Sequence, residues 1–292
     1  METQKISNSW RITGIILVSL YAIASFIKFF FYPDEESIGR TAVFIIFILI
    51  SFFLAIKRFG VKNTIVFLVI SFGVAWGFET TSVLTGFPFG PYHYTRGPLL
   101  GVVPVPLGFG YFSPGVLAWL ITSILLDKKD ISMKGIDIFL LPFIGSFILT
   151  MWDLCYDPSG STIMQVYIWE QGGVFFGVPV SNFLGWMFCS FILFFLFSLY
   201  LSRDKRPQSE TVVEDKTFWI LPIATYASLA IGYFGQALYA KNYEVVAVNG
   251  HKYWTGDIYG SLAVVSIFTV IFVSIYALVR VLRSNDNRRL SP

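Results

Sequence analysis

The stretch that decides the fold is residues 65–94, which read IVFLVISFGVAWGFETTSVLTGFPFGPYHY. Its first part, Ile65–Thr85, is apolar and long enough to cross a membrane as a helix, yet it contains one carboxylate, Glu79. A loop of Gly, Pro and aromatic residues, Gly86–Tyr94, follows directly. A carboxylate inside a membrane span costs roughly 3 kcal/mol on insertion scales, so it usually marks a working site. The stretch therefore indicates a membrane protein that uses an acid.

A second acidic site follows the same pattern further along the chain. Asp153 lies near the end of the apolar run Ile136–Leu154, and Asp157 follows it beside a proline. The motif Val-Pro-Val at 103–105 recurs 75 residues later at 178–180, and each copy precedes a Gly-aromatic pair. Parallel repeats are familiar in membrane folds. The sequence therefore predicts two equivalent units, each with an acid-bearing rising helix, a lid loop and a descending helix that begins at a proline.

Composition places the chain in a membrane. Hydrophobic residues make up 55% of its 292 residues and charged residues only 13%, too few charges to cover the surface of a soluble domain. Eight apolar stretches are long enough to cross a hydrocarbon core of about 30 Å. They are residues 12–31, 41–56, 63–85, 110–126, 136–154, 182–201, 218–240 and 258–281. We therefore predict an all-α, polytopic transmembrane helical bundle of about eight spans, or of seven with one re-entrant segment.

The distribution of Lys and Arg predicts the orientation. Of the 21 basic residues, one group falls in both termini and in alternate loops, and a smaller group falls in the remaining connections. The larger group is Lys5, Arg11, Lys57, Arg58, Lys62, Lys128, Lys129, Lys134, Arg203, Lys205, Arg206, Lys216, Arg280, Arg283, Arg288 and Arg289, and the smaller is Lys28, Arg40, Arg96, Lys241 and Lys252. Because basic residues accumulate on the cytoplasmic side, we expect both termini in the cytoplasm. Loops 86–109, 155–181 and 241–257 are then expected to cap the outer face.

We expect residues 1–292 to form one transmembrane domain of a multi-pass cell-membrane protein. The first apolar run has no small-residue cleavage site after it and is expected to remain as a span. Two cysteines, Cys155 and Cys189, do not suggest a disulfide framework. The net charge of +3 comes from the cytoplasmic flanks, so no nucleic-acid partner is expected.

Each acid has a structural interpretation beside the functional one. Glu79 should lie about 24 Å up its helix at 1.5 Å per residue, either as a proton donor or as a carboxyl that is hydrogen-bonded to a neighbouring helix. Asp153 is poorly solvated between apolar neighbours, which favours function. Asp157 precedes Pro158, which disfavours helix, so we expect it to be the first loop residue, folded over the site or holding a turn.

Aromatic residues are expected to surround these acids. Aromatic faces stabilise positive charge and pack against flat apolar ligands, although interfacial belts also use them. Topology brings ten of them to the outer end: Trp76, Phe78, Phe87, Phe89, Tyr92, Tyr94, Trp152, Tyr156, Trp169 and Trp186. His93 lies in the same loop, either as a pocket residue or as a loop hydrogen-bonding residue. An acid within aromatic walls is what the protonation of an isolated alkene requires, without a metal or a cofactor.

The sequence lacks the residues that several other kinds of enzyme chemistry require. The two histidines, His93 and His251, are too few for the histidine cluster of a membrane di-iron oxygenase. No Gly-rich nucleotide loop, Walker motif or CxxC motif is present. Oxygen that is installed by this protein should therefore come from water and not from O2.

Taken in order, these motifs resemble the integral-membrane carotenoid biosynthesis family that includes bisanhydrobacterioruberin hydratases and related carotenoid 1,2-hydratases. The similarity spans residues 65–200, which we interpret as the motif-bearing catalytic core. The matching pieces are Glu79 with Thr85-Gly-Phe-Pro-Phe-Gly-Pro-Tyr-His-Tyr94, Gly101-Val-Val-Pro104, Asp153-Leu-Cys-Tyr-Asp157-Pro158, Trp169 and Gly177-Val-Pro-Val-Ser-Asn182-Phe-Leu-Gly185-Trp186.

The resemblance implies addition of water across the terminal C=C of an acyclic carotenoid end group, giving a tertiary alcohol. Asp153 or Glu79 would protonate the alkene, and Asp157, Tyr92 or Tyr94 would position water or accept its proton. Asn182 would orient that water. Trp76, Phe87, Phe89, His93, Trp152, Trp169 and Trp186 would bind the polyene. The implied partners are the carotenoid, water, the lipid bilayer and other carotenoid enzymes, with no cofactor and no metal.

Three alternatives remain open at this stage. A carotene cyclase would use the same protonation but trap the cation with an alkene. A polyprenyl transferase would use Asp153-x-x-x-Asp157 to hold Mg²⁺ and diphosphate, although such a site also needs basic residues. A carotenoid transporter or non-catalytic binder would use the same pocket without turnover.

Overall fold

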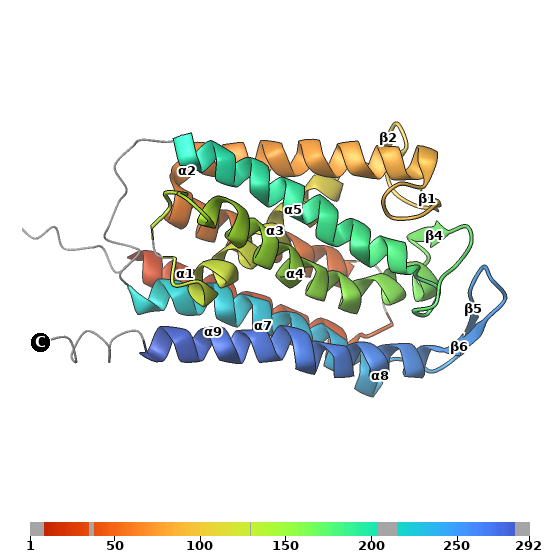
Figure 1. Ribbon diagram of the computed structural model, residues 1–292. Helices are drawn as coiled ribbons and strands as arrows, with labels where there is room; N and C mark the ends of the chain where they lie inside the picture. The colour runs from red at the N-terminus through yellow and green to blue at the C-terminus, as the bar shows by residue number, and fades with distance from the viewer. Residues whose placement is uncertain (1–8, 35–37, 129, 204–214, 284–292) are drawn as a thin grey trace, which may run out of the picture.

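The computed structural model describes residues 9–34, 38–128, 130–203 and 215–283, and Figure 1 shows them as a bundle of long helices. The helical elements are α1 (Ser9–Phe26), η1 (Ile27–Phe31), α2 (Ile38–Thr85), α3 (Leu107–Leu125), α4 (Asp137–Pro158), η2 (Ser159–Ile163), α5 (Val180–Arg203), α7 (Lys216–Tyr239), α8 (Thr255–Ser266), η3 (Ile267–Ile271) and α9 (Phe272–Arg283). Here η denotes a π-helical turn, and each joins or extends an α-helix. The predicted all-α membrane bundle is confirmed.

The number of spans depends on α2. Among the described residues, seven helices are long and apolar enough to cross a membrane, and α2 is by far the longest at 48 residues. It is divided at Gly60, whose φ of 76° and ψ of 165° are not helical. At 1.5 Å per residue the undivided helix would be about 70 Å long, more than twice a hydrocarbon core. The two predicted runs 41–56 and 63–85 are therefore the two halves of α2, joined at this glycine.

The two ends of the bundle differ in character. The short strands lie at one end, called here the strand end, and both ends of the described chain lie at the opposite end, called the far end (Figure 1). At the far end Arg11, at the start of α1, forms an ion pair with Asp215, which caps α7. Lys216, which follows it, donates to the carbonyl of Leu282 near the end of α9. These contacts place both ends of the described chain at the same end of the bundle, as an even number of crossings requires.

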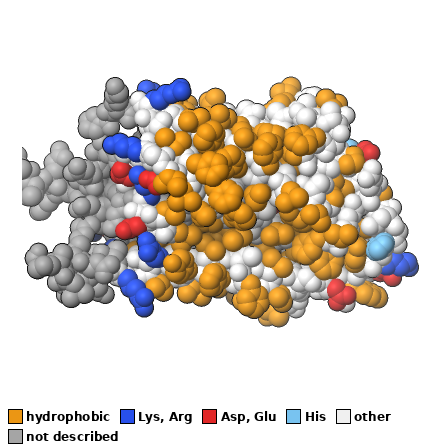
Figure 2. All heavy atoms as spheres, viewed as in Figure 1, with side chains coloured by type: hydrophobic (Ala, Val, Ile, Leu, Met, Phe, Trp, Pro, Cys, Tyr) orange, Lys and Arg blue, Asp and Glu red, His pale blue; other side chains and the backbone are white. Residues whose placement is uncertain are grey.

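A single helix, α3, forms the centre of the bundle. Its residues 111–124 are all buried, between α2, α4, α7 and α9. The outer helices instead expose large apolar side chains, such as Phe268, which is 73% exposed. Figure 2 shows these side chains as a broad hydrophobic belt, with Lys and Arg gathered mainly at the far end. This belt is the surface that a bilayer would cover.

The concentration of Lys and Arg at the far end agrees with the grouping of basic residues along the sequence from which the orientation was predicted. Of the basic residues in that count, Lys5, Lys129, Lys205, Arg206, Arg288 and Arg289 lie outside the described residues. Which end faces the cytoplasm stays a prediction.

Three two-stranded sheets close the strand end. The strands are β1 (Tyr92–Tyr94), β2 (Leu99–Leu100), β3 (Val103–Pro104), β4 (Tyr167–Trp169), β5 (Glu244–Val246) and β6 (Lys252–Trp254). The pairs are β1 with β4, β2 with β3 and β5 with β6, all antiparallel. The pairing of β1 with β4 joins the two long loops 86–109 and 155–181, as expected for loops that fold back over the helix ends.

The internal repeat is visible in this pairing. Residues of the first loop match residues 75 positions later, and His93 faces its own equivalent, Ile168, across the sheet. The flanking hydrogen bonds obey the same relation, because Thr95 N donates to Val166 O and Glu170 N donates to Pro91 O, both at 3.0 Å. The strand pairing therefore agrees with the 75-residue offset of the predicted repeat.

The backbone of the two loops repeats as well. Left-handed φ angles occur at Gly90, Gly97 and Gly101, and again at the equivalent positions Gln165, Gly172 and Phe176. The bridge between Leu100 and Val103 recurs between Phe175 and Val178. The second half of α2 thus corresponds to α4, and α3 corresponds to α5.

Candidate functional site

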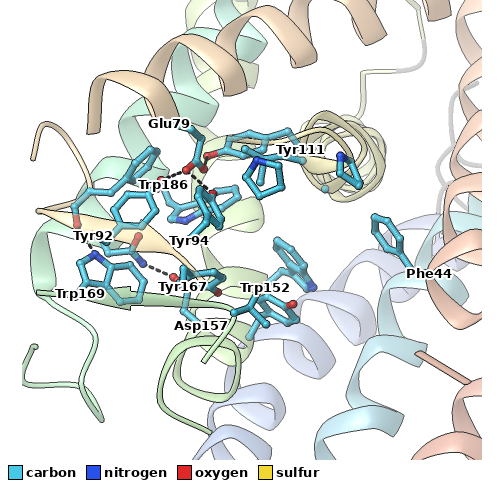
Figure 3. A pocket seen from close by; sticks show the side chains of 18 residues that line it. Phe44, Glu79, Tyr92, Tyr94, Tyr111, Trp152, Asp157, Tyr167, Trp169 and Trp186 are labelled. Atoms are coloured by element: carbon cyan, nitrogen blue, oxygen red, sulfur yellow. Dashed lines mark hydrogen bonds between the residues drawn. The ribbon is translucent and has the colours of Figure 1, made fainter. Parts of the chain in front are cut away.

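A cavity of about 270 Å³ lies beneath the β1–β4 sheet, between the two repeat units. Figure 3 shows its side chains pointing inward from the second half of α2, the two loops, α3, α4 and α5. Its lining is Phe44, Glu79, Phe89, Tyr92, Tyr94, Pro104, Pro106, Leu107, Gly110, Tyr111, Trp152, Tyr156, Asp157, Val166, Tyr167, Trp169, Asn182 and Trp186. Nine of the thirteen residues that the sequence assigned to the site are among them.

Glu79 is held by three tyrosine hydroxyls. Its carboxyl group is buried, with 4% of the residue exposed. Tyr111 donates to Oε1 at 2.6 Å, Tyr94 donates to Oε2 at 2.8 Å, and Tyr92 also donates to Oε2. The tyrosines come from β1 and from α3. Three phenol donors therefore satisfy the hydrogen-bonding capacity of this carboxyl group in a site from which water is largely excluded.

A second cluster faces Glu79 across the cavity. Tyr167 of β4 donates to Asp157 Oδ1 at 2.6 Å, and Asn182 Nδ2 donates to Oδ2 of the same carboxyl. The same Nδ2 atom donates to Asp153 Oδ2 at 3.2 Å. The two aspartates are also in carboxyl–carboxyl contact, and Asp153 Oδ1 is buried without a hydrogen-bond partner among the described residues. Two carboxyl groups in contact can share one proton between them.

The expectation that Asp157 leaves the helix is wrong. α4 continues to Pro158, whose φ of −61° is helical, and the chain then widens into η2. Proline favours a φ near this value. It has no N–H to donate to the preceding turn, and the wider π-helical turn that follows accommodates this loss. Asp153 and Asp157 therefore stand one turn apart on the same helix face.

The tyrosines connect the two clusters. The rings of Tyr94 and Tyr167 are 5.9 Å apart, and those of Tyr92 and Tyr167 are 6.4 Å apart. Burial, and then the neighbouring Glu79 carboxylate, raises the pKa of Tyr94 well above its usual range. Burial, and then Asp157, does the same to the pKa of Tyr167. Both phenols therefore remain protonated at neutral pH and act as hydrogen-bond donors.

The aromatic walls are fixed by contacts among themselves. Trp186 stacks on Tyr111 with ring centroids 4.4 Å apart, and Trp152 packs edge-on against Trp186 at 6.1 Å. The indole N–H of Trp169 donates to the carbonyl of Phe89 at 3.0 Å, which ties β4 to the first loop. The ring faces therefore have set positions, as a site for a flat or cationic group requires.

Four of the residues assigned from sequence do not line this cavity. Asp153 is fully buried behind Asn182 and does not line the cavity itself, although it contacts Asn182 and Asp157, which do. Trp76 is half-buried on another face of α2. Phe87 is 59% exposed at the surface, and His93 lies outside near Glu170, 3.8 Å from its carboxylate.

Two residues that hold the acids were missed, Tyr111 and Tyr167. Tyr111 holds Glu79, and its position matches Trp186 in the repeat, which was assigned to the site. Tyr167 holds Asp157, and its position matches Tyr92, which was also assigned. The repeat itself was therefore the signal that could have identified both.

Comparison with known proteins agrees with this geometry. The family model described as carotenoid biosynthesis protein matches residues 39–249, which include both acid clusters and every residue that lines the cavity. The chain belongs to this family. The family places the protein among those of carotenoid biosynthesis, in agreement with the resemblance that the motifs suggested.

A curated relative matches part of the chain. It is the bisanhydrobacterioruberin hydratase of Haloarcula japonica, 32% identical over 132 residues, which cover 44% of this chain and 43% of the relative. The chain thus matches less than half the length of this curated relative. No solved structure matches the chain.

Proposed function

We propose that this protein is a carotenoid hydratase of the cell membrane, which adds water to the terminal C=C of an acyclic carotenoid end group. One observation carries the proposal: Glu79 and Asp157 face a single aromatic-walled cavity from opposite sides, each held by tyrosine hydroxyls. Addition of water needs an acid on one side of the alkene and an acceptor for the proton of water on the other. The family and the hydratase named among its relatives support the same reaction.

Asp157 is the proton donor in this proposal. It lines the cavity, whereas Asp153 lies behind it and shares its hydrogen-bond donor, Asn182. The proton that the aspartate pair retains moves from Asp157 to the less substituted alkene carbon, and the π bond becomes the new C–H bond. The pair is left with one more negative charge, which Asn182 and Tyr167 stabilise by donating to it.

The aromatic walls stabilise the tertiary carbocation that results. The rings of Tyr111, Trp152 and Trp186 lie between the two acid clusters and present apolar or π-rich surface to the cavity. Cation–π attraction in a desolvated site is worth about 2 kcal/mol or more. Held in place by mutual packing, these rings do not need to reorganise as the charge develops.

Glu79 completes the reaction as the base. Water attacks the cation to form the C–O bond, and the released proton passes to the Glu79 carboxylate through the hydroxyl of Tyr92 or Tyr94. In this proposal Glu79 is ionised before water attacks, so its carboxylate can accept the proton. Return of this proton to the aspartate pair closes the cycle, so the net reaction consumes only the alkene and one water.

The polyprenyl transferase alternative, in which Asp153 and Asp157 would hold Mg²⁺, fits these contacts less well. A cation shared by Asp153 and Asp157 would need their oxygens to be turned toward it. In the structure the Nδ2 atom of Asn182 donates to both carboxyls and occupies that position. A cyclase would use the same proton donor. The three tyrosine hydroxyls around Glu79 favour water, rather than a second alkene, as the group that captures the carbocation.

The test is expression in a cell that accumulates an acyclic carotene, followed by mass spectrometry of the pigments. The expected product is heavier by the mass of one water, with oxygen that derives from labelled water and not from labelled O2. A product of unchanged mass with a ring would establish the cyclase instead. Unchanged pigment that co-purifies with the protein would establish a binder.

A further inference from the structure

Part of the wall of the acid-lined cavity is a short hairpin, residues 97–106, which contains β2 and β3. Pro104 and Pro106 line the cavity, so one face of the hairpin belongs to the site. The other face is exposed: Leu99, which pairs with Pro104, and Leu100 have 46% and 62% of each residue exposed. The hairpin therefore separates the cavity from whatever surrounds the protein at this place.

The composition of this hairpin suits lipid better than water. Residues 97–106 consist entirely of Gly, Pro, Leu and Val, with no charged or polar side chain. Pro98, Pro104 and Pro106 have no N–H group, and Val105 N donates to Pro98 O at 3.0 Å. Non-helical backbone near hydrocarbon is tolerated only where its polar groups are satisfied, and this segment has few donors to satisfy.

The position of the hairpin agrees with its composition. Figure 1 shows β2 at the side of the bundle, beside the last turns of α2, whereas β5 and β6 extend past the ends of the helices. Those turns of α2 belong to a helix that is apolar enough to cross a membrane. The β5–β6 hairpin instead carries an exposed ion pair between Lys252 and Glu244, as expected in water. A bilayer around the helices would reach the first hairpin and leave the other in water.

The segment 75 residues later shows what a covered hairpin looks like. There the ring of Phe176 packs edge-on against Tyr253 of β6, with centroids 5.5 Å apart. Gly101 is the equivalent of Phe176, and a Cβ atom built on it meets nothing within 4 Å. The β5–β6 hairpin thus covers the later segment, whereas nothing in the described part of the chain packs at the equivalent position of the first hairpin.

We propose that the exposed face of the β2–β3 hairpin lies in the lipid of the leaflet at the strand end, and that the hairpin is the entrance through which the polyene passes from the bilayer into the acid-lined cavity. This inference rests on the proposed function for the identity of the polyene. A carotenoid dissolves in lipid and not in water, because exposing apolar surface costs about 25 cal/mol per Å². Movement of the hairpin away from α2 opens the wall that Pro104 and Pro106 form.

The first test measures what surrounds the hairpin. Leu99→Cys is labelled with bimane in detergent and reconstituted into phosphatidylcholine vesicles. Val174→Cys, at the equivalent position of the later segment and 83% exposed, is the matched control. Lipid with brominated acyl chains should quench the label at position 99 more strongly than aqueous iodide does, and the order should be reversed at position 174. Quenching at position 99 by iodide and not by brominated lipid would overturn the proposal.

The second test measures entry of the polyene. An acyclic carotene is added from a cyclodextrin complex to vesicles that contain the protein, and quenching of tryptophan fluorescence is followed in time. Leu100→Asp should slow this quenching at least about tenfold, with the same final extent, because a carboxylate is costly in lipid and holds the hairpin in water. Val174→Asp is the matched control and should keep the wild-type rate, as should Leu100→Phe, which remains apolar. Leu99→Asp replaces Leu100→Asp if that variant does not fold, and a wild-type rate in the charged variant would overturn the entrance.

Both tests are made in an Asp157→Asn background, so that neither depends on turnover. If Leu100→Asp slows entry but the protein with Asp157 intact leaves the mass of the carotene unchanged, the proposed function fails and the entrance stands. If that protein hydrates the carotene but the label at position 99 is in water, the entrance fails and the hydratase proposal stands.

Discussion

Tyr111 stacks on Trp186 with an interplanar angle of 14°, and the two residues occupy equivalent positions in the two repeat units. Their rings therefore meet in the wall of the cavity, between the acid of one unit and the acids of the other. Tyr111 also donates to Glu79 at 2.6 Å, so a single side chain forms part of the aromatic wall and of the carboxylate cluster. The repeat thus places the two halves of the proposed reaction on opposite sides of one cavity.

Tyr111→Phe should reduce activity while leaving the fold intact. The ring and its stacking remain, but Glu79 loses the only described donor to Oε1. Loss of one preorganised hydrogen bond in a site of this kind costs about 10²-fold or more in rate. The control is Tyr200→Phe, which removes a hydroxyl that donates to Asn63 at the far end. Turnover in detergent or vesicles is the measurement, and equal rates for the two variants would contradict the role of Tyr111.

Asp157→Asn should lower the rate by about 10²–10⁴-fold, the usual contribution of a general acid. Asp153→Asn should cost less, because Asp153 lies behind Asn182 and acts on the alkene only through Asp157. The double variant should be no slower than Asp157→Asn, since residues that act as one unit do not add. Single-turnover rates check this order. A larger loss in the Asp153 variant would make that residue the donor.

The arrangement of spans and the repeat could be predicted because both leave local signals. Apolar runs of spanning length, and a Val-Pro-Val motif at two places, are visible without any knowledge of packing. The rotation of each helix about its own axis is not visible in the sequence. Along α2 the buried positions Ser71, Ala75, Glu79 and Ser82 alternate with exposed Gly73, Gly77 and Leu84. In a membrane the core face need not be more apolar than the lipid face, so the hydrophobic pattern that orients the helices of soluble proteins does not apply.

This ambiguity explains the misplaced and missed residues. Trp76 was assigned to the site because the topology brings it to the outer end of the bundle, but it lies on a face of α2 that is only half-buried. Tyr111 was missed because its contact with Glu79 spans 32 residues and depends on how α3 packs against α2. Phe44 lines the cavity from the first half of α2, outside the predicted core 65–200. Only the folded arrangement of the helices reveals such contacts.

Stability should fall as the pH rises above about 10, the ordinary pKa of tyrosine. The pKa values of Tyr94 and Tyr167 are raised in the folded state. In that range the unfolded chain releases these protons while the folded chain keeps them, so the free energy of unfolding decreases with pH. Tyr167→Phe should make this decrease shallower. Melting temperature against pH in detergent checks it, and identical slopes for the variant and the wild type would contradict the assignment.

The strand end should face away from the cytoplasm, as the distribution of basic residues predicts. Val174, in the loop before α5, is 83% exposed at that end, and Lys134 is exposed at the far end. In intact cells a membrane-impermeant maleimide should label Val174→Cys, and it should label Lys134→Cys only after permeabilisation. The native Cys155 and Cys189 are buried and should give little background. The reverse pattern would invert the orientation and place the site near the cytoplasm.

Gly110→Phe should stop turnover by closing the junction between the acid-lined cavity and the neighbouring cavity between α1, the first half of α2 and α7. Gly110 lines both spaces, and a Cβ atom built on it meets no atom within 4 Å. The new ring can therefore enter the junction without a backbone clash, and Gly110→Ala should be nearly silent because a methyl group leaves the passage open. A substrate held even 1 Å out of place can lose about 10²-fold in rate. Gly73→Phe is the matched control, since Gly73 is also helical with free space around its Cβ position, but on an exposed face. Melting temperatures establish that all three variants fold. Full activity of Gly110→Phe would mean that the substrate occupies the acid-lined cavity alone and does not pass through the junction.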